Sequence, residues 1–349
     1  MHGKITWESP SNIALVKYWG KYGDQLPRNP SLSMTLRRSL TQTTIQYNQV
    51  PDQKEVTLQF LFEGSPNTSF EGRLLNYLKR IALKYPVLSE LNLSISSQNT
   101  FPHSSGIASS ASAFSALSLG LLSIIHQCTQ QAVEPAAFLQ EASELARLGS
   151  GSACRSVYGG FSVWGQTEGF SDYSNRYALP LTTPVHEVFQ NLNDAILIVN
   201  AGTKRVGSSA GHQLMDSNPY AQVRYVQAQQ HVAELHQVLA EGNTNKFVEI
   251  VEQEALTLHA LMMASQPGYV LMEGATLAII DRIRAFRQQT GIPVCFTLDA
   301  GPNVHMLYPD SYKKEIVDLI NRDLLLFCTS NRFLDDGMGL GPVKVTDQE

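Results

Sequence analysis

Two kinds of hydrophobic periodicity occur along the chain. Residues 91–98 ("LNLSISSQ") carry an apolar side chain at every second position, which predicts a half-buried β-strand. Residues 113–125 repeat apolar side chains at spacings of three and four, which predicts a core-facing α-helix. The continuous apolar run "DAILIVN" (194–200) indicates a buried strand. Strands and helices in irregular order favour an α+β architecture over a repeated parallel βαβ array.

The same patterns predict most of the remaining elements. Alternating segments on either side of "PDQK" predict a β-hairpin over residues 41–62. Leu74, Leu78 and Ile81 recur on one helical face, and Ser69 is a suitable N-cap for that helix. Further predicted elements are helices over 135–147, 220–240, 245–264, 275–289 and 311–320, and a strand over 294–298.

The length of the chain predicts two domains. With 349 residues, each half can bury a core of its own. Residues 180–192 contain turn residues without a clear period, so we place the boundary there. The predicted domains are residues 1–187 and residues 188–349, the second of which contains Asp299.

Composition and charge exclude some classes of partner. Hydrophobic residues make up 43% of the chain and charged residues 16%, as in ordinary globular proteins. The net charge of −5 argues against nucleic acid as a partner. The four cysteines show no CxxC spacing, which favours buried thiols in a reducing compartment. We find no signal-peptide pattern, and the apolar run 114–125 is too short and too rich in Ser and Gly to cross a bilayer. We therefore expect a cytoplasmic protein without a membrane partner.

The segment "FPHSSGIASSASAFSALSLGLL" (101–122) places small residues where a helix begins. The first N–H groups of a helix lack partners and carry the positive end of its dipole, so phosphates can bind there if side chains are small. Serine hydroxyls add hydrogen-bond donors and ligands for Mg²⁺. The same pattern also fits a serine-capped core helix. The candidate phosphate-binding residues are Pro102, Ser104, Ser105, Gly106, Ala108, Ser109 and Ser110.

Charged residues in three other short segments are candidates for chemistry. Asp299 ends a predicted strand in "LDAGPN" and could orient a substrate hydroxyl, although an aspartate at this place also caps turns. In "KYWGK", Lys17 and Lys21 would share one strand face and Tyr18 the other, unless Gly20 bends the chain. Two solvated lysines beside a packed aromatic ring are the alternative.

The segment "GSGSACRS" (149–156) combines flexible backbone with an arginine. Glycines on both sides of Ser150 let N–H groups turn towards an anion, and Arg155 offers a fork suited to a carboxylate or phosphate. A glycine-rich surface turn is the alternative reading. Small residues also recur over 207–211.

These segments together resemble a known family. The pattern P-x-x-x-G-[LI]-A-S-S-A at 102–111 is similar to the phosphate loop of the GHMP kinase superfamily. Residues 9–36, 149–164 and 292–307 resemble the three motifs of the diphosphomevalonate decarboxylase family, in the family order. The resemblance implies a two-domain GHMP-kinase-like fold. It would join a ribosomal-protein-S5-domain-2-like N-terminal domain to a ferredoxin-like α/β sandwich, with the active site in the cleft between them.

The resemblance also implies an activity. It is the ATP- and Mg²⁺-dependent decarboxylation of (R)-5-diphosphomevalonate to isopentenyl diphosphate, CO₂, ADP and phosphate through 3-phosphorylation, in the mevalonate pathway of isoprenoid biosynthesis. A homodimer is expected. The implied catalytic residues are Asp299, Lys17, Arg155 and Ser109. The implied substrate-binding residues are Tyr18, Lys21, Ser150, Gly151, Ser152, Arg155, Ser208, Ser209 and His212. Asn99 joins the phosphate-loop residues as a nucleotide contact, Ser109 and Ser110 are the Mg²⁺ ligands, and Asn12 is a nucleotide or structural candidate.

Some positions depart from the family pattern. Pro30 stands where a serine is common, His103-Ser104-Ser105 replaces Thr-Ala-Ala, and Ser209 and His212 occupy places of other residues in the diphosphate segment. Two alternatives therefore stay open. One is a relative that only phosphorylates the 3-hydroxyl or decarboxylates the monophosphate, and the other is a catalytically silent ligand sensor. The joint presence of Lys17, Arg155 and Asp299 favours full decarboxylation.

Overall fold

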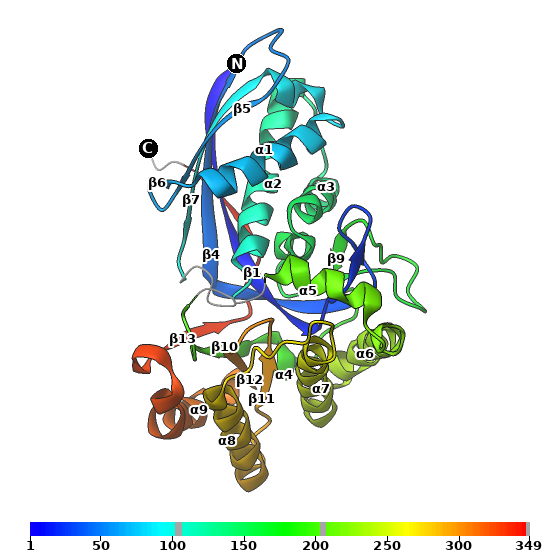
Figure 1. The fold of residues 1–349 in the computed structure, drawn as a ribbon, viewed down its shortest axis with the longest axis vertical. Helices are drawn as coiled ribbons and strands as arrows, with labels where there is room; N and C mark the ends of the chain where they lie inside the picture. The colour runs from blue at the N-terminus through cyan, green and yellow to red at the C-terminus, as the bar shows by residue number, and fades with distance from the viewer. Residues whose placement is uncertain (102–106, 203–206, 347–349) are drawn as a thin grey trace.

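The computed structural model describes residues 1–101, 107–202 and 207–346. It has an upper part built on a large sheet and a lower part built on a smaller sheet (Figure 1). The predicted α+β, two-domain GHMP-like fold is confirmed. The boundary between residues 187 and 188 stays a prediction.

The large sheet runs in the order β14-β1-β4-β7-β5-β6, and β8 pairs with β4 and β9 beside that path. Its pairings are antiparallel except for β5 with β7. The final strand, β14, pairs with the first strand, β1, so the chain returns to the upper part at its end. The strands are β1 (His2–Val16), β4 (Ser31–Gln49), β5 (Thr57–Phe62), β6 (Ser65–Pro66), β7 (Leu91–Asn99), β8 (Phe161–Trp164), β9 (Ala178–Pro180) and β14 (Val343–Val345).

Helices cover one face of this sheet (Figure 1). The central one buries Phe114, Leu117, Leu121 and Ile125 in the core, as the periodicity predicted. The elements are α1 (Thr68–Ala82), the 3₁₀ turn η1 (Pro86–Glu90), α2 (Ser109–Thr129), α3 (Pro135–Gly149) and the 3₁₀ segment η2 (Gly151–Val157).

The smaller sheet is antiparallel in the order β11-β12-β10-β13. Its strands are β10 (Leu192–Leu197), β11 (Cys295–Leu298), β12 (Val304–Pro309) and β13 (Phe333–Gly337). The helices here are α4 (Glu187–Gln190), α5 (Ser208–Leu214), α6 (Ala221–Glu241), α7 (Thr244–Met263), α8 (Gly274–Thr290) and α9 (Lys313–Leu319). Short turns are η3 (Met215–Ser217), η4 (Asp310–Tyr312), the π-helical η5 (Ile320–Leu324), η6 (Leu325–Phe327) and η7 (Thr329–Asn331).

One hydrophobic cluster joins the two parts. Leu32 and Met34 of β4 pack in the same cluster as Ile196 of β10, Leu235 of α6 and Val251 of α7, and all five are buried. Close packing of this kind fixes the relative position of the elements, because a shift would open voids. Side chains that project from either part into the space between them are therefore held at defined distances.

The predicted hairpin over 41–62 is wrong. Strand β7 lies between β4 and β5, with Ile95 opposite Ile45 on one side and Phe60 on the other. All three side chains are buried, so the pairing follows from hydrophobic contacts far apart in sequence. The local alternation marked both strands but could not choose their neighbours.

Smaller corrections concern caps and the "KYWGK" segment. Asn67, not Ser69, caps α1 through its side-chain oxygen, which accepts from the Phe70 N–H at 3.0 Å. Ser311 lies inside η4 rather than at the N-cap of α9. Residues 17–20 are not a strand, because β1 ends at Val16 and Gly20 has φ +98°. The face-sharing argument for Lys17 and Lys21 therefore does not apply.

Three of the four thiols and most of the apolar helix α2 lie in the interior. Cys154, Cys295 and Cys328 are buried and Cys128 is partly exposed, and all four are free. Within the described ranges, α2 is the helix long and apolar enough to span a membrane by length and composition. From the sequence we judged the run 114–125 too short to cross a bilayer, but the helix that contains it extends from Ser109 to Thr129. Most of α2 is packed inside the fold, however, as a core helix is.

Candidate active site

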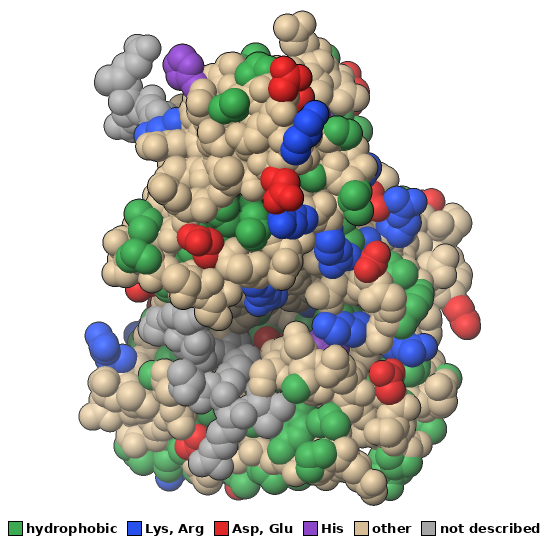
Figure 2. All heavy atoms as spheres, turned by 45° about the horizontal axis from the view of Figure 1, so that its top comes forward, with side chains coloured by type: hydrophobic (Ala, Val, Ile, Leu, Met, Phe, Trp, Pro, Cys, Tyr) green, Lys and Arg blue, Asp and Glu red, His purple; other side chains and the backbone are tan. Residues whose placement is uncertain are grey.

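A cleft of about 460 Å³ lies between the two parts (Figure 2). Lys and Arg side chains gather around this hollow on the face shown. The three motif segments all reach it, together with the starts of α2 and α5. Every predicted site residue that the structure describes lines the cleft: Lys17, Tyr18, Lys21, Asn99, Ala108, Ser109, Ser110, Ser150, Gly151, Ser152, Arg155, Ser208, Ser209, His212 and Asp299. Pro102, Ser104, Ser105 and Gly106, as well as His103, lie outside the described residues.

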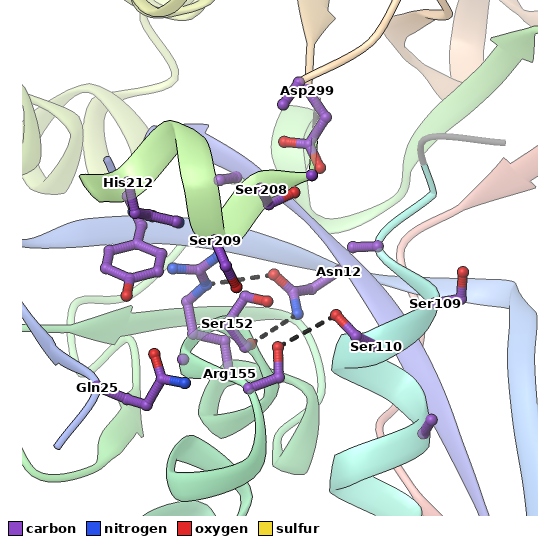
Figure 3. Close-up of a pocket in the computed structure, with 18 of the residues that line it drawn as sticks. Asn12, Gln25, Ser109, Ser110, Ser152, Arg155, Ser208, Ser209, His212 and Asp299 are labelled. Carbon is purple, nitrogen blue, oxygen red and sulfur yellow. Dashed lines mark hydrogen bonds between the residues drawn. The ribbon is translucent and has the colours of Figure 1, made fainter. Parts of the chain in front are cut away.

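Lys17 and Asp299 form the charged pair of the cleft. The Lys17 Nζ lies 3.8 Å from the Asp299 Oδ1. The lysine is 1% exposed, whereas the Asp299 side chain is 29% exposed and projects into the cleft (Figure 3). Burial lowers the pKa of Lys17 to about 8, and the carboxylates of Asp299 and Glu254 limit that fall. The ammonium group therefore keeps its proton at neutral pH and loses it as the pH rises through about 8.

Arg155 is a second buried cation. Its Nη1 donates to the Ser31 Oγ at 2.6 Å and its Nε donates to the Asn12 Oδ1 at 3.2 Å. Asn12 is itself held by the Ser156 Oγ at 2.7 Å. Among the described residues no carboxylate forms a salt bridge with Arg155, although it is only 3% exposed. A buried guanidinium held in place by neutral groups favours an anionic ligand in the cleft.

Several buried polar atoms of the cleft lack a hydrogen-bond partner among the described residues. They are the Lys17 Nζ, the Tyr18 hydroxyl, the Trp19 Nε1 and the Asn99 Nδ2. Burial raises the pKa of Tyr18, so its hydroxyl keeps the proton. All four groups can donate hydrogen bonds. Because unsatisfied buried donors are costly, their common position indicates a ligand rich in acceptor oxygens.

His212 is a neutral hydrogen-bonding group in this cleft. Burial, together with the nearby cations of Lys21 and Arg155, lowers its pKa to about 3. Its Nδ1 accepts from the Gly20 N–H at 2.9 Å, so the Nε2 carries the ring hydrogen. The ring packs against Tyr18 and Trp19 with centroid distances of 4.3 and 4.6 Å. The neutral tautomer can therefore donate a hydrogen bond at any ordinary pH.

Serine hydroxyls of two helical segments meet at the other side of the cleft (Figure 3). The Ser110 Oγ and the Ser150 Oγ are 3.1 Å apart, and Ser109 and Ser152 line the same wall. The backbone enters α2 through Ala108, whose φ is +38°. Helix start, small side chains and hydroxyls together make a surface that a phosphate chain can approach.

Magnesium fits this wall only with help from phosphate. No cluster of three His, Cys, Asp or Glu side chains that could hold a metal occurs in the part of the chain that the structure describes. Mg²⁺ commonly takes most of its ligands from water and substrate phosphates, with one or two from the protein. The hydroxyls of Ser109 and Ser110 suit that role.

Sequence analysis missed some residues of the cleft. Phe60, Phe62 and Phe70 line the cleft, and we call these three rings the aromatic arm. Arg73 of α1 and Gln25 also line the cleft. The Gln25 Oε1 accepts from the Lys21 Nζ at 2.9 Å. Most of these residues lie in ordinary strand, helix or turn sequence, so no local pattern marked them. Two missed residues had a signal, because Trp19 lies inside "KYWGK" and Gln25 lies inside the motif segment 9–36.

Comparisons with known proteins agree with this geometry. Residues 9–175 match the diphosphomevalonate decarboxylase-like N-terminal domain, and residues 195–336 match the mevalonate 5-diphosphate decarboxylase C-terminal domain. A diphosphomevalonate decarboxylase of Ganoderma lucidum is 32% identical over 91% of this chain and 81% of its own. The Homo sapiens enzyme is 30% identical over 90% and 78%. The crystal structure of mevalonate diphosphate decarboxylase from Staphylococcus aureus is 27% identical, covers 99% of both chains and has a TM-score of 0.83. The chain belongs to the diphosphomevalonate decarboxylase family.

Proposed function

We propose that the chain catalyses the ATP-dependent decarboxylation of (R)-5-diphosphomevalonate to isopentenyl diphosphate, CO₂, ADP and phosphate. The observation that carries the proposal is the meeting of Asp299, Lys17 and Arg155 in one cleft. These groups come from segments far apart in sequence. A branched substrate with a hydroxyl, a carboxylate and a diphosphate needs such a set. Family membership supports the same activity.

In the first step Asp299 orients the 3-hydroxyl for attack on the γ-phosphoryl group. A tertiary alcohol is far too weak an acid to lose its proton beforehand, so position contributes more than basicity. The ammonium of Lys17 lies 3.8 Å from the Asp299 Oδ1 and attracts the carboxylate electrostatically, which helps to hold it in position. As the bond between the 3-oxygen and the γ-phosphorus forms, the bond from that phosphorus to the bridging oxygen of ADP breaks. ADP leaves with the electron pair, and the hydroxyl proton passes to Asp299.

In the second step the C3–O bond breaks and the new phosphate leaves with its electron pair. The electrons of the bond between C2 and the carboxylate carbon form the C2=C3 double bond, and CO₂ departs. Hydrogen bonds to Ser31 and Asn12 fix Arg155. Its guanidinium can therefore keep the substrate carboxylate oriented for C–C bond cleavage and stay in place when CO₂ leaves. Tyr18 and Lys21 hold the diphosphate. The buried donors thus restrain the substrate at both ends.

ATP and Mg²⁺ are part of the proposal. The start of α2, with Ser109 and Ser110, would bind the ATP phosphates, and the aromatic arm of Phe60, Phe62 and Phe70 suits the adenine ring. Mg²⁺ held by these hydroxyls and the phosphates would neutralise charge that develops during transfer. We also propose a cytoplasmic homodimer that binds neither nucleic acid nor membrane. The four free thiols support a reducing compartment such as the cytoplasm. The net charge of −5 supports the absence of a nucleic-acid partner.

The direct experiment measures ADP and CO₂ from the purified protein. With diphosphomevalonate we expect one CO₂ for each ADP. ADP without CO₂ would identify a 3-kinase, and preference for the monophosphate would identify a phosphomevalonate decarboxylase. Tight binding of diphosphomevalonate with neither product would indicate a silent sensor.

Replacing Asp299 tests the first step. Asp299→Asn keeps the size of the side chain but removes the proton acceptor, so ADP and CO₂ formation should fall by about a thousandfold or more. ATP binding and thermal stability should stay near those of the wild type. The control is Asp318→Asn, since Asp318 is exposed on α9. A turnover number within tenfold of the wild type would refute the assignment of Asp299.

Replacing Arg155 separates binding from the second step. Arg155→Ala should raise the barrier by about 3 kcal/mol, mainly as a lower kcat, because the guanidinium holds the carboxylate while the C–C bond breaks. Arg155→Lys keeps the charge without the planar fork and should recover only part of the rate. A change confined to KM for diphosphomevalonate would reduce Arg155 to a binding group.

The pH dependence of kcat/KM reports the free enzyme. Lys17 acts as a cation, and burial together with its neighbours places its pKa at about 8. Below that pH the ammonium is charged, and above it the charge is lost, so kcat/KM should fall as pH rises through about 8. The Lys17→Met variant should have a lower kcat/KM at every pH, and its profile should lack this alkaline limb, the decrease of kcat/KM above about pH 8. A wild-type profile that stays flat from pH 7 to 9.5 would contradict the role of Lys17.

A further inference from the structure

We infer that helix α7 positions both members of the charged pair, through Glu254 on the main chain of Lys17 and through His259 on the main chain of Asp299. Glu254 and His259 are then positioning residues that touch no substrate. The inference rests on the proposed function, because it explains how the cleft keeps its reacting pair aligned. Both contacts come from one helix, yet they reach segments at opposite ends of the sequence.

The first contact holds Lys17 where it leaves the sheet. Strand β1 ends at Val16, so the peptide groups of Lys17 no longer belong to the ladder although the residue is buried. The Lys17 N–H donates to the Glu254 Oε2 at 2.8 Å. Its carbonyl accepts from the Arg224 Nη2 and from the Asn29 Nδ2, each at 2.9 Å. Buried backbone groups need such partners, and here Glu254 of α7, Arg224 of α6 and Asn29, which precedes β4, supply them.

Glu254 is itself fixed on all sides. Both of its oxygens accept from Arg224, at 2.6 and 2.5 Å, and the His231 Nδ1 lies 2.5 Å from its Oε1. Burial alone would raise the pKa of Glu254, but Arg224 and His231 outweigh burial and lower it to about 2. The carboxylate is therefore charged at every relevant pH. A buried, bidentate ion pair is a rigid anchor for the peptide that it holds.

The second contact holds Asp299. The His259 Nε2 lies 3.1 Å from the Asp299 carbonyl oxygen. A carbonyl only accepts, so the Nε2 donates, and burial lowers the pKa of His259 to about 4, which keeps the ring neutral. His259 follows Glu254 by five residues, a rise of about 7.5 Å along the helix. A straight helix cannot change that separation, so it sets the distance between the two anchored segments.

Glu254 also acts on the charge of Lys17. The groups that act on the ammonium from the surrounding elements are Asp299 after β11, Glu254 on α7, Arg155 on η2, Asp194 on β10, and His259 on α7. Asp299 and Glu254 raise the pKa of Lys17 against burial, and Arg155 lowers it. Removing the charge of Glu254 must therefore lower the pKa of Lys17. A residue with a merely structural role would leave that pKa unchanged.

The test compares two glutamates of the same helix. Glu254→Gln should lower kcat about tenfold and move the alkaline limb of kcat/KM to lower pH by about half a unit or more. Glu252→Gln is the matched control, because Glu252 is also buried and paired, with Arg284 at 3.0 Å and Arg287 at 2.6 Å. It should cost stability and leave the limb in place. A folded Glu254→Gln protein with the wild-type limb would overturn the inference.

A second pair of variants covers the case in which Glu254→Gln does not fold. The double variant R224M/E254L removes both buried charges together, which proteins tolerate better than one unpaired charge. It should lower kcat about tenfold, as Glu254→Gln does, because the Lys17 N–H loses the same acceptor. Its limb should shift less, because the cation of Arg224 is removed together with the anion. A folded double variant with the wild-type kcat would also overturn the inference. For the other contact, His259→Gln keeps a donor and should retain kcat within about threefold, whereas His259→Leu should lose about tenfold. Equal rates for the two His259 variants would refute that contact.

A titration without substrate separates this inference from the proposed function. Lysine labelled with ¹³C at Cε reports the Lys17 charge by NMR, and Lys17→Met assigns its signal. The midpoint should lie near pH 8 in the wild type and lower in Glu254→Gln. If the wild type has no turnover with diphosphomevalonate, the proposed function fails while this comparison still decides the inference. Identical midpoints would overturn it.

Discussion

A lysine ammonium group buried between the two parts of the molecule is the constraint on which the site depends. Lys17 is 1% exposed, and its Nζ has the Asp299 carboxylate at 3.8 Å. Burying a charge costs several kcal/mol unless other groups compensate it. Asp299 and Glu254 compensate in part, and the pKa of about 8 shows that the balance is incomplete. An anion in the cleft would complete it, and the neighbouring donors without partners call for the same kind of ligand.

This requirement connects the fold to the chemistry. The ammonium comes from the end of β1, the carboxylate from the end of β11, and the guanidinium from η2. These groups act as one site only because the core shared by β4, β10, α6 and α7 fixes the two sheets relative to each other. Reaction of a substrate with three functional groups depends on such alignment, since small displacements of reacting atoms are costly. The packing that stabilises the junction therefore also sets the distances between the catalytic groups.

The sequence predicted the parts of the site that lie in short, unusual segments. Asp299 and Lys17 lie two and three residues before a glycine, and Arg155 precedes Ser156, in patterns that ordinary core packing does not need. Glu254, His259, Arg224 and Arg73 could not be predicted, because each occupies an ordinary position within a helix and gains its role only through tertiary contacts. The error over the 41–62 hairpin has the same cause. Alternation identifies a strand, but the insertion of β7 between β4 and β5 depends on burial across the whole sheet.

Proton uptake on substrate binding tests the central claim most directly. Calorimetry at pH 8, without ATP and in buffers of different ionisation enthalpy, counts the protons taken up when diphosphomevalonate binds. Because Lys17 is about half protonated at that pH and an anion favours its charged form, the wild type should take up about half a proton more than Lys17→Met. Equal proton uptake by the two proteins would mean that the buried ammonium does not face the bound anion, and the account would fail.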